Sequence, residues 1–342
     1  MTKIAVVILN WNGKNLLEKF IPSVLKHTAD ENCEVWVADN GSGDDSIFFL
    51  KENYPEVSIF ELGRNYGFAE GYNRALAGIR ADYYVLLNSD VETSPGWLEP
   101  MLELMESDNS VAACQPKIKF YENQDYFEHA GAAGGFIDFL GYPFCRGRIF
   151  DVIEKDRGQY NITSDIFWAS GACMMVRSET WRLNGGFDSR FFAHMEEIDY
   201  CWRLKNRGYR IMSCYKSEVY HVGGATLPRS NPHKTFLNFR NNLLLLLKNL
   251  PAKQLPWIIM LRIVFDWMSV VKFLFAFSAA DAFAVIKSHL AFFRLLPFYI
   301  RNRRILQKKR EVNFHSEVYR KSIVFDFFIR KKRYFSSLIF TG

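Results

Sequence analysis

The sequence predicts an α/β protein built on a mainly parallel β-sheet with helices on both faces. Short apolar segments rich in β-branched residues, at 4–9, 34–38, 57–62 and 83–87, alternate with amphipathic segments at 15–27, 45–53, 68–80 and 96–105. This alternation is typical of parallel strands that are buried under helices on both sides. The 342 residues are enough for one such domain of about 200–250 residues and an additional region.

The later part of the chain divides into an irregular stretch, three further elements and a separate C-terminal region. Residues 107–165 lose the alternation and are rich in Gly and aromatic residues, so we expect an irregular insertion over one edge of the sheet. A strand is expected at 166–176, a helix from Ser178, and further helices at 196–207 and 235–249, which Gly208 and Pro251 would end. We therefore expect a first domain at 1–250 and a helical region at 251–342.

Charge is divided unevenly between these two regions. Residues 251–342 contain 17 Lys and Arg residues and 5 Asp and Glu residues, a net charge of +12. The remaining 26 Lys and Arg residues and 32 Asp and Glu residues give residues 1–250 a net charge of −6. A basic region suits nucleic acid or an anionic membrane surface, and the many Phe, Leu, Ile and Trp residues here favour the membrane.

The six cysteines contain no CxxC pair, so they indicate neither a zinc site nor a disulfide framework and fit a reducing cytoplasm. The strand-like run near the N-terminus is too short for a signal peptide.

The C-terminal region contains two long apolar segments, 257–280 and 282–300. Five charged residues interrupt them: Arg262, Asp266, Lys272, Lys287 and Arg294. A membrane span needs about 20 predominantly apolar residues, whereas charges at this spacing suit amphipathic helices that lie in the bilayer surface. The basic clusters 301–304, 308–310 and 330–333 would then meet anionic lipid. We expect a peripheral protein on the inner face of the plasma membrane; a membrane span, a helical cap on the first domain and a dimer interface are the alternatives.

Four polar loops follow the predicted strands, at 10–13, 39–44, 64–73 and 88–92. Ligands of open parallel sheets bind beyond the carboxyl ends of the strands, where these loops would meet. Each loop alone is explained by a turn before an N-capped helix, but four at one edge indicate a ligand site. The run VLLNSD ends at Asp90, whose carboxylate suits Mg²⁺ or Mn²⁺, because these cations prefer oxygen ligands and often share them with substrate phosphates.

The motifs in these loops resemble those of the inverting glycosyltransferases of family 2, which have the GT-A fold. They follow the family's order over residues 3–249: VVILNWNG, VADNGSGDDS, RNYGFAEGYNRAL, LLNSDVE, WASGACMMVRSETWRLNGGFDSRFF, MEEIDYCWRLKNRGY and YHVGGATL. The most similar subgroup transfers rhamnose or related sugars in bacterial surface-polysaccharide assembly. The resemblance implies a nucleotide-diphospho-sugar donor and a glycan or polyprenyl-diphosphate-linked acceptor, and no nucleic acid.

The resemblance also implies which residues bind the donor nucleotide. Asp39 would hydrogen-bond the base or the ribose, which an acceptor-only carboxylate can do. Asn10 and Asn12 would line the same pocket, and Arg64 and Asn65 would flank the nucleotide.

The metal and sugar positions follow from the same resemblance. Asp90 matches the last carboxylate of the family's DxD motif, which holds a metal bridging the diphosphate, while Asn88 replaces the first Asp and so bears on metal affinity and identity. His221 would complete the metal shell or contact the diphosphate. Trp168 would offer an apolar face to a sugar ring, with a core position as the alternative. Residues 240–241 would reach a phosphate or face solvent.

The catalytic base is implied by an acidic pair at the start of the helix at 196–207. In the family, the second acid of this pair takes the proton from the acceptor hydroxyl, so Glu197 is the expected base and Glu196 the second candidate. The family has Asp at the second position, and the longer Glu changes the reach to the hydroxyl. Asp199 is expected to serve structure. Without the resemblance, three acids in a first helical turn complement the helix dipole.

Three other classes of protein remain as alternatives. A nucleotidyltransferase also binds nucleotides on an α/β sheet, but no lysine- and glycine-rich phosphate loop follows the first strand. An NAD-dependent oxidoreductase is disfavoured because GxGxxG is missing there. A membrane-bound nucleotide-sugar or glycan binding module of the same fold, without turnover, is the non-enzymatic alternative.

Overall fold

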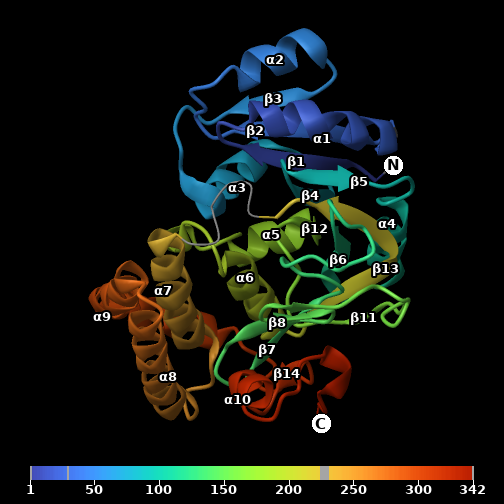
Figure 1. Cartoon of the computed structure of the whole chain (residues 1–342). Coiled ribbons are helices and arrows are strands. Elements are labelled where there is room, and N and C mark those ends of the chain that lie inside the picture. Colours follow the sequence, from blue (N-terminus) through green and yellow to red (C-terminus); the bar gives the residue numbers. More distant parts are fainter. Residues whose placement is uncertain (1, 29–30, 224–230, 341–342) are drawn as a thin grey trace.

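The structure, a computed structural model, describes residues 2–28, 31–223 and 231–340 (Figure 1). The first half of the chain forms β1 (Ile4–Asn10), α1 (Lys14–His27), β2 (Cys33–Asp39), α2 (Ser46–Asn53), β3 (Ser58–Glu61), α3 (Gly67–Gly78), β4 (Tyr83–Asn88), β5 (Val91–Thr93), α4 (Glu99–Ser107), β6 (Val111–Phe120), β7 (Gly135–Asp138), β8 (Pro143–Cys145), β9 (Arg148–Ile149), β10 (Val152–Ile153) and β11 (Ser164–Asp165).

The second half is mostly helical. It forms β12 (Cys173–Arg177), α5 (Ser178–Asn184), the 3-10 helix η1 (Ser189–Phe191), α6 (Glu196–Lys205), β13 (Arg210–His221), α7 (Pro232–Asn249), α8 (Leu255–Phe275), α9 (Ala279–Lys308), β14 (Val318–Tyr319), α10 (Ile323–Phe328) and a 3-10 helix η2 (Phe335–Ser337).

The main sheet has the order β11-β13-β6-β12-β4-β1-β2-β3, with β5 paired to β13. Strand β1 is parallel to both β2 and β4, and β2 is parallel to β3. The exception near the centre is β12, which is antiparallel to β4 and β6. The expected mainly parallel sheet is confirmed, and the carboxyl ends of β1, β2 and β4 lie at one edge.

Helices cover both faces of this sheet because its strands bury side chains on both sides. On β1, Ile4, Val6 and Ile8 belong to a core with α1, α2 and α4, whereas Ala5 and Val7 belong to a core with α3, α5 and α6. This two-residue alternation follows from the pleat of a strand. The short apolar runs that predicted buried strands are therefore placed as expected.

Two expectations for the middle of the chain are wrong. The stretch expected to be an irregular insertion contains β6, a ten-residue strand inside the main sheet. Pro116, Lys117 and Lys119 hide its apolar pattern, and the structure accommodates the buried ammonium of Lys117 by a 2.7 Å ion pair with Asp156. The strand expected at 166–176 is shorter, because β12 begins only at Cys173.

A second, five-stranded sheet joins the middle of the chain to its end. Its order is β10-β9-β8-β7-β14, and β14 pairs in parallel with β7. Figure 1 shows α7, α8 and α9 grouped beside this sheet, with α10 close to its strand β14. One hydrophobic core contains Phe136 and Phe144 together with Tyr319 and Ile323. The core thus crosses the boundary predicted after residue 250.

The charges within α8 do not lie where the sequence suggested. Arg262 and Asp266, expected on the polar outer side of an amphipathic helix, are 4% and 0% exposed and form an ion pair of 2.7 Å. Arg262 also donates to Asn242 of α7, and Asp266 lies 3.1 Å from His289 of α9. These charges face the protein because α7 and α9 supply partners there, which leaves the apolar side of α8 exposed.

Candidate active site

The first two predicted loops are joined at the edge of the sheet by side-chain hydrogen bonds. Asp39 ends β2 and accepts from the backbone N–H groups of Gly41 and Ser42 at 3.1 and 2.9 Å. Asn10 ends β1 and donates to Asp39 at 3.2 Å. Asn12 has a positive φ of 51° and accepts from the N–H of Gly43 at 2.7 Å. Three of the predicted nucleotide-binding residues therefore form one connected set.

The third predicted loop joins this set through a residue that the sequence analysis missed. Asn40 is 2% exposed and donates to Oδ1 of Asn65 and to the carbonyl of Gly67 at 3.2 and 3.1 Å. Arg64 is exposed, and its guanidinium lies 4.6 Å from the ring centre of Tyr66. Arg64 and Asn65 thus border the loop after β2, with the exposed guanidinium of Arg64 over Tyr66 at the rim.

The fourth predicted loop carries Asp90, which is 4% exposed. Nε2 of His221, at the end of β13, lies 3.0 Å from Oδ1 of Asp90 and 3.3 Å from Nδ2 of Asn88. On the other side of the imidazole, Nδ1 lies 3.1 Å from Oε2 of Glu128. Burial acts to lower the pKa of His221, but the two carboxylates outweigh it and raise that pKa to about 10. Coordination of a metal by His221 requires the neutral imidazole, so binding of a cation there would release the proton that the two acids favour.

The donor set at Asp90 fits a cation that is held mainly by its substrate. No group of three or more His, Cys, Asp or Glu suited to hold a metal occurs within 2–28, 31–223 and 231–340. One carboxylate and one imidazole remain at the end of β4, next to polar loops. Mg²⁺ is commonly bound by one or two carboxylates plus substrate phosphates, so Asp90 and His221 are a sufficient protein contribution.

A strained turn precedes the helix that carries the acidic pair. Phe192, His194 and Met195 have φ values of 67°, 68° and 72°, which non-glycine residues rarely adopt. Asn241 of α7 holds this turn, because its Nδ2 lies 3.0, 2.9 and 2.8 Å from the carbonyl oxygens of residues 191, 193 and 194. Arg240 donates to the carbonyls of residues 190 and 191. Both side chains therefore bind the protein backbone rather than forming a solvated helix face.

Glu196 and Glu197 follow this turn at the start of α6. Each has one carboxylate oxygen that is buried and has no hydrogen-bond partner in the described part of the chain. Burial raises the pKa of Glu197 to about 7, and burial together with the Glu197 charge raises the pKa of Glu196 well above its ordinary value. Two buried carboxyl groups with raised pKa values and unpartnered oxygens are costly in a purely structural position, which favours a catalytic role.

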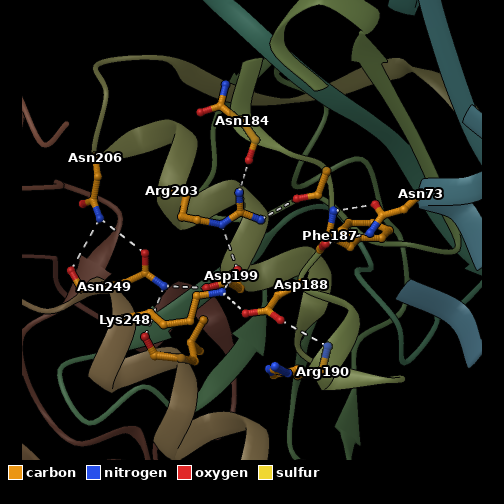
Figure 2. A network of polar contacts seen from close by, with 12 residues as sticks. Asn73, Asn184, Phe187, Asp188, Arg190, Asp199, Arg203, Asn206, Lys248 and Asn249 are labelled. Atoms are coloured by element: carbon orange, nitrogen blue, oxygen red, sulfur yellow. Dashed lines mark hydrogen bonds and ion pairs between the residues drawn. The ribbon is translucent and has the colours of Figure 1, made fainter. Parts of the chain in front are cut away.

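The third acid of α6 has the structural role expected of it. Asp199 is fully buried and accepts from Arg203, Lys248 and Asn249 at 2.8, 2.6 and 2.8 Å (Figure 2). Arg203 in turn donates to the carbonyls of residues 184 and 186 at 2.6 Å each. Burial opposes ionisation, but Lys248 and Arg203 keep the pKa of Asp199 below its ordinary value. This network fixes the start of α6 against α7.

Trp168, expected to face a sugar ring, is instead only 5% exposed. Its indole N–H donates to the carbonyl of Phe136 at 2.9 Å, and the ring packs where a Cβ on Gly135 would be. The indole is thus held in the core between the two sheets, which was the alternative position for this residue.

Two residues of the site were missed for different reasons. Glu128 lies in the stretch interpreted as an irregular insertion, and its approach to His221 depends on the unrecognised strand β6. Asn40 directly follows Asp39, so its place in the polar loop was a usable signal. The motif YHVGGATL is only partly observed, because residues 224–227 lie outside the described residues.

Solved glycosyltransferase structures have this fold. GalNAc-T7 with UDP, GalNAc and Mn²⁺ matches with a TM-score of 0.56 and 15% identity over 72% of this chain and 48% of that chain. The mannosyltransferase PcManGT from Pyrobaculum calidifontis, in complex with GDP-Man and Mn²⁺, matches with a TM-score of 0.52 and 13% identity over 90% and 84%. The chain therefore has the GT-A fold of nucleotide-diphospho-sugar transferases. The model of glycosyl transferase family 2 matches residues 5–181, and the chain belongs to this family.

Curated relatives include a bacterial rhamnosyltransferase and a bacterial O-antigen biosynthesis protein. The N-acetylglucosaminyl-diphospho-decaprenol L-rhamnosyltransferase of Mycobacterium tuberculosis is 26% identical over 63% of this chain and 75% of that protein. The O-antigen biosynthesis protein RfbC of Myxococcus xanthus is 26% identical over 66% of this chain and 18% of that protein. The protein is thus a nucleotide-sugar glycosyltransferase, and the comparisons give no support to a binding module without turnover.

Proposed function

We propose that the protein transfers rhamnose or a related sugar, with inversion, from a nucleotide-diphosphate donor to a hydroxyl of a glycan linked to a polyprenyl diphosphate. Names of the relatives in Mycobacterium tuberculosis and Myxococcus xanthus support this donor and acceptor class and a place in surface-polysaccharide synthesis. The observation that carries the mechanism is the carboxyl group of Glu197, which has a buried, unpartnered oxygen and a pKa of about 7.

The reaction is a single displacement at the anomeric carbon. Glu197 accepts the proton of the acceptor hydroxyl while the oxygen of that hydroxyl forms the new glycosidic bond to the anomeric carbon. The bond between the anomeric carbon and the diphosphate breaks, and its electron pair goes to the leaving diphosphate. A base with a pKa near the working pH suits this proton transfer. Glu196 is the second candidate for the base. The strained turn at 192–195 orients both carboxyl groups.

The donor lies over the loops beyond β1, β2 and β4. Asp39 accepts a hydrogen bond from the base or ribose, Asn10 and Asn12 shape that pocket, and Arg64 and Asn65 flank the nucleotide. Asp90 and His221, with Asn88 beside them, would hold Mg²⁺ or Mn²⁺. The cation would supply charge stabilisation to the leaving diphosphate. A peripheral position on the inner face of the plasma membrane gives access to a lipid-linked acceptor.

Donor binding and base substitution test this proposal together. UDP-, dTDP- and GDP-sugars are screened by thermal shift with and without Mn²⁺, because a ligand of the native state raises its apparent stability. Transfer of a labelled sugar to a polyprenyl-diphosphate-linked acceptor is then followed, and NMR of the product gives its anomeric configuration. We expect Glu197→Gln to lower transfer by about 10²–10⁴-fold with little change in donor affinity. A product with retained configuration, or a larger loss in Glu196→Gln, would contradict the assignment.

A further inference from the structure

The outer surface of α8 and α9 exposes large apolar side chains along both helices. On α8, Trp257, Met260, Trp267 and Met268 are between 43% and 61% exposed. Monomeric soluble proteins rarely expose a continuous apolar surface of this kind, and where it occurs it marks a binding surface.

The apolar character is greatest where the two helices meet and continues along α9. At the connection between them, Phe275 is 82% and Phe277 98% exposed. Along α9, Phe283, Leu290 and Phe293 are between 52% and 67% exposed. We call this surface, with its α8 side chains, the apolar face.

Every exposed charge on this part of the molecule is positive. Between residues 252 and 310, all of which the structure describes, the acids are Asp266 and Asp281. Asp266 is fully buried, and Asp281 accepts from Thr235 and Ser278 at 2.6 and 2.5 Å. The exposed charged residues are Lys253, Lys272, Lys287, Arg294, Arg301, Arg304, Lys308 and Lys309.

Protein contacts on the inner side of α9 argue against a membrane span. By length and composition alone, α9 is the one helix in the described ranges that is able to cross a membrane. However, Arg303 donates to the carbonyls of Leu247 and Leu250 at the end of α7, at 2.6 Å each. Tyr299 and Phe292 belong to the main core. One side of α9 therefore packs against the protein, and the other side is exposed.

We propose that the apolar face docks in the plane of an anionic lipid bilayer, with the connection between α8 and α9 as its deepest point. An apolar side flanked only by cations is the composition of helices that lie in a membrane surface, because the aromatic and aliphatic groups enter the acyl boundary and the cations meet the lipid head groups. The net charge is −6 on residues 1–250 and +12 on residues 251–342. This difference favours the same orientation, with the C-terminal region toward the anionic bilayer. A protein partner would need a matching acidic surface, and a second copy would bring like charges together.

The geometry also connects this surface to the active site. Asp281, just after the exposed connection, is bonded to Thr235 in the first turns of α7. The ring of His233 lies 6.4 Å from that of Phe192, which is part of the strained turn before α6. The deepest point of the docked surface is therefore at the end of α7 nearest the acidic pair, where a lipid-linked acceptor would arrive from the bilayer.

Vesicle binding tests this surface without any sugar chemistry, so its outcome is independent of the proposed reaction. Full-length protein is sedimented with phosphatidylcholine vesicles with and without 30% phosphatidylglycerol. One variant combines Phe275→Ser with Phe277→Ser, and a second combines Arg294→Glu with Arg301→Glu. The matched control combines Phe48→Ser, which is 63% exposed on α2, with the exposed Arg80→Glu. Thermal melting is used to check that each variant is folded.

We expect the wild-type protein to bind the anionic vesicles, with binding weakened by salt, and each face variant to lose at least about tenfold in affinity while the control stays within about twofold. The charge variant changes no apolar group, so it keeps the test valid if the aromatic variant fails to fold. Wild-type protein that stays in the supernatant, or binding that survives both face variants, would overturn the proposal. So would a wild-type dimer that Phe275→Ser with Phe277→Ser dissociates, because a second copy would then cover the face.

Discussion

At the scale of single residues, the site is defined by carboxyl groups that the protein holds in unfavourable surroundings. Glu196 and Glu197 are buried beside each other with unpartnered oxygens. Glu128 and Asp90 share one imidazole, His221. Buried acids without compensation reduce the stability of the folded chain, so Glu196 and Glu197 invite a test in which activity and stability move in opposite directions.

The first such test concerns Glu197. Its pKa is about 7 in the folded protein against an ordinary 4.5, so its contribution lowers stability progressively as the pH rises from 4.5 to 7. Glu197→Gln should therefore raise the free energy of unfolding at pH 8 by on the order of 1–2 kcal/mol, allowing for partial exposure, and leave it unchanged at pH 4. Wild-type kcat/KM should rise with pH around 7, and the variant should lose this limb. Thermal melting at the two pH values and a pH–rate profile measure both effects.

Glu128 is expected to position His221 rather than to touch the substrate. Outer groups that orient a metal-binding histidine typically contribute about 10–100-fold to metal affinity. Glu128→Ala should therefore raise the Mn²⁺ concentration needed for half-maximal thermal shift in the presence of nucleoside diphosphate by about tenfold or more, and saturating Mn²⁺ should restore much of the activity. Glu122→Ala, an exposed acid nearby in sequence, is the control. Unchanged metal dependence in Glu128→Ala would remove this role.

At the scale of elements, the turn between η1 and α6 links the proposed catalytic acids to the rest of the fold. Its backbone is held by Asn241 on α7 and by α3, where the N–H groups of Phe68 and Ala69 donate to the carbonyl of Phe192. Positive φ angles at non-glycine residues persist only where the surroundings fix them. The position of α6 therefore depends on α7, a helix that carries none of the proposed catalytic residues.

Removal of the Asn241 side chain should relax this turn. Asn241→Ala removes a donor from the carbonyls of residues 193 and 194, while the carbonyl of residue 191 keeps Arg240 as a donor. Each buried unsatisfied group costs about 1–3 kcal/mol, part of which water entry would recover. We expect a measurable loss of stability and a fall in kcat of at least about tenfold, with a smaller change in the KM for the donor, since the donor loops are untouched. Asn53→Ala, which removes one bond at the exposed end of α2, serves as control. Wild-type kcat in Asn241→Ala would show that the turn does not depend on this residue.

The extent to which sequence predicted these elements follows from the range of the interactions involved. Strands β1 to β4 were predictable because local apolar periodicity and the polar groups that end it are both short-range signals. Strand β6 was not, because Pro116 and Lys117 break the pattern and their partners, such as Asp156, are distant in sequence. Asn241 is another such case, since its three acceptors lie some fifty residues earlier in the chain.

At the scale of the whole molecule, the C-terminal region is integrated with the catalytic fold rather than attached to it. Strand β14 extends the second sheet, and Lys205 at the end of α6 is 2.9 Å from Glu317. Arg262 and Asp266, two of the α8 charges that suggested a surface helix, instead pair with each other and contact α7 and α9. Sequence identified the basic and apolar composition correctly, but which side of each helix faces the protein depends on contacts that composition does not encode.

This integration predicts that residues 1–250 and 251–342 unfold together. Their core is shared, so deletion after Asn249 would expose Phe136 and Phe144, which pack against Phe335 and Phe340. We expect calorimetry of the full chain to give one transition with equal calorimetric and van't Hoff enthalpies. Arg303→Ala, which frees the carbonyls that end α7, should lower this single transition without splitting it. Arg304→Ala on the exposed side of α9 is the matched control. In a cooperative structure with a shared core, loss of the shared contacts leaves no folded intermediate. Two separate transitions, or a stable proteolytic fragment ending near residue 250, would therefore contradict this prediction and establish that the tail is an independent unit.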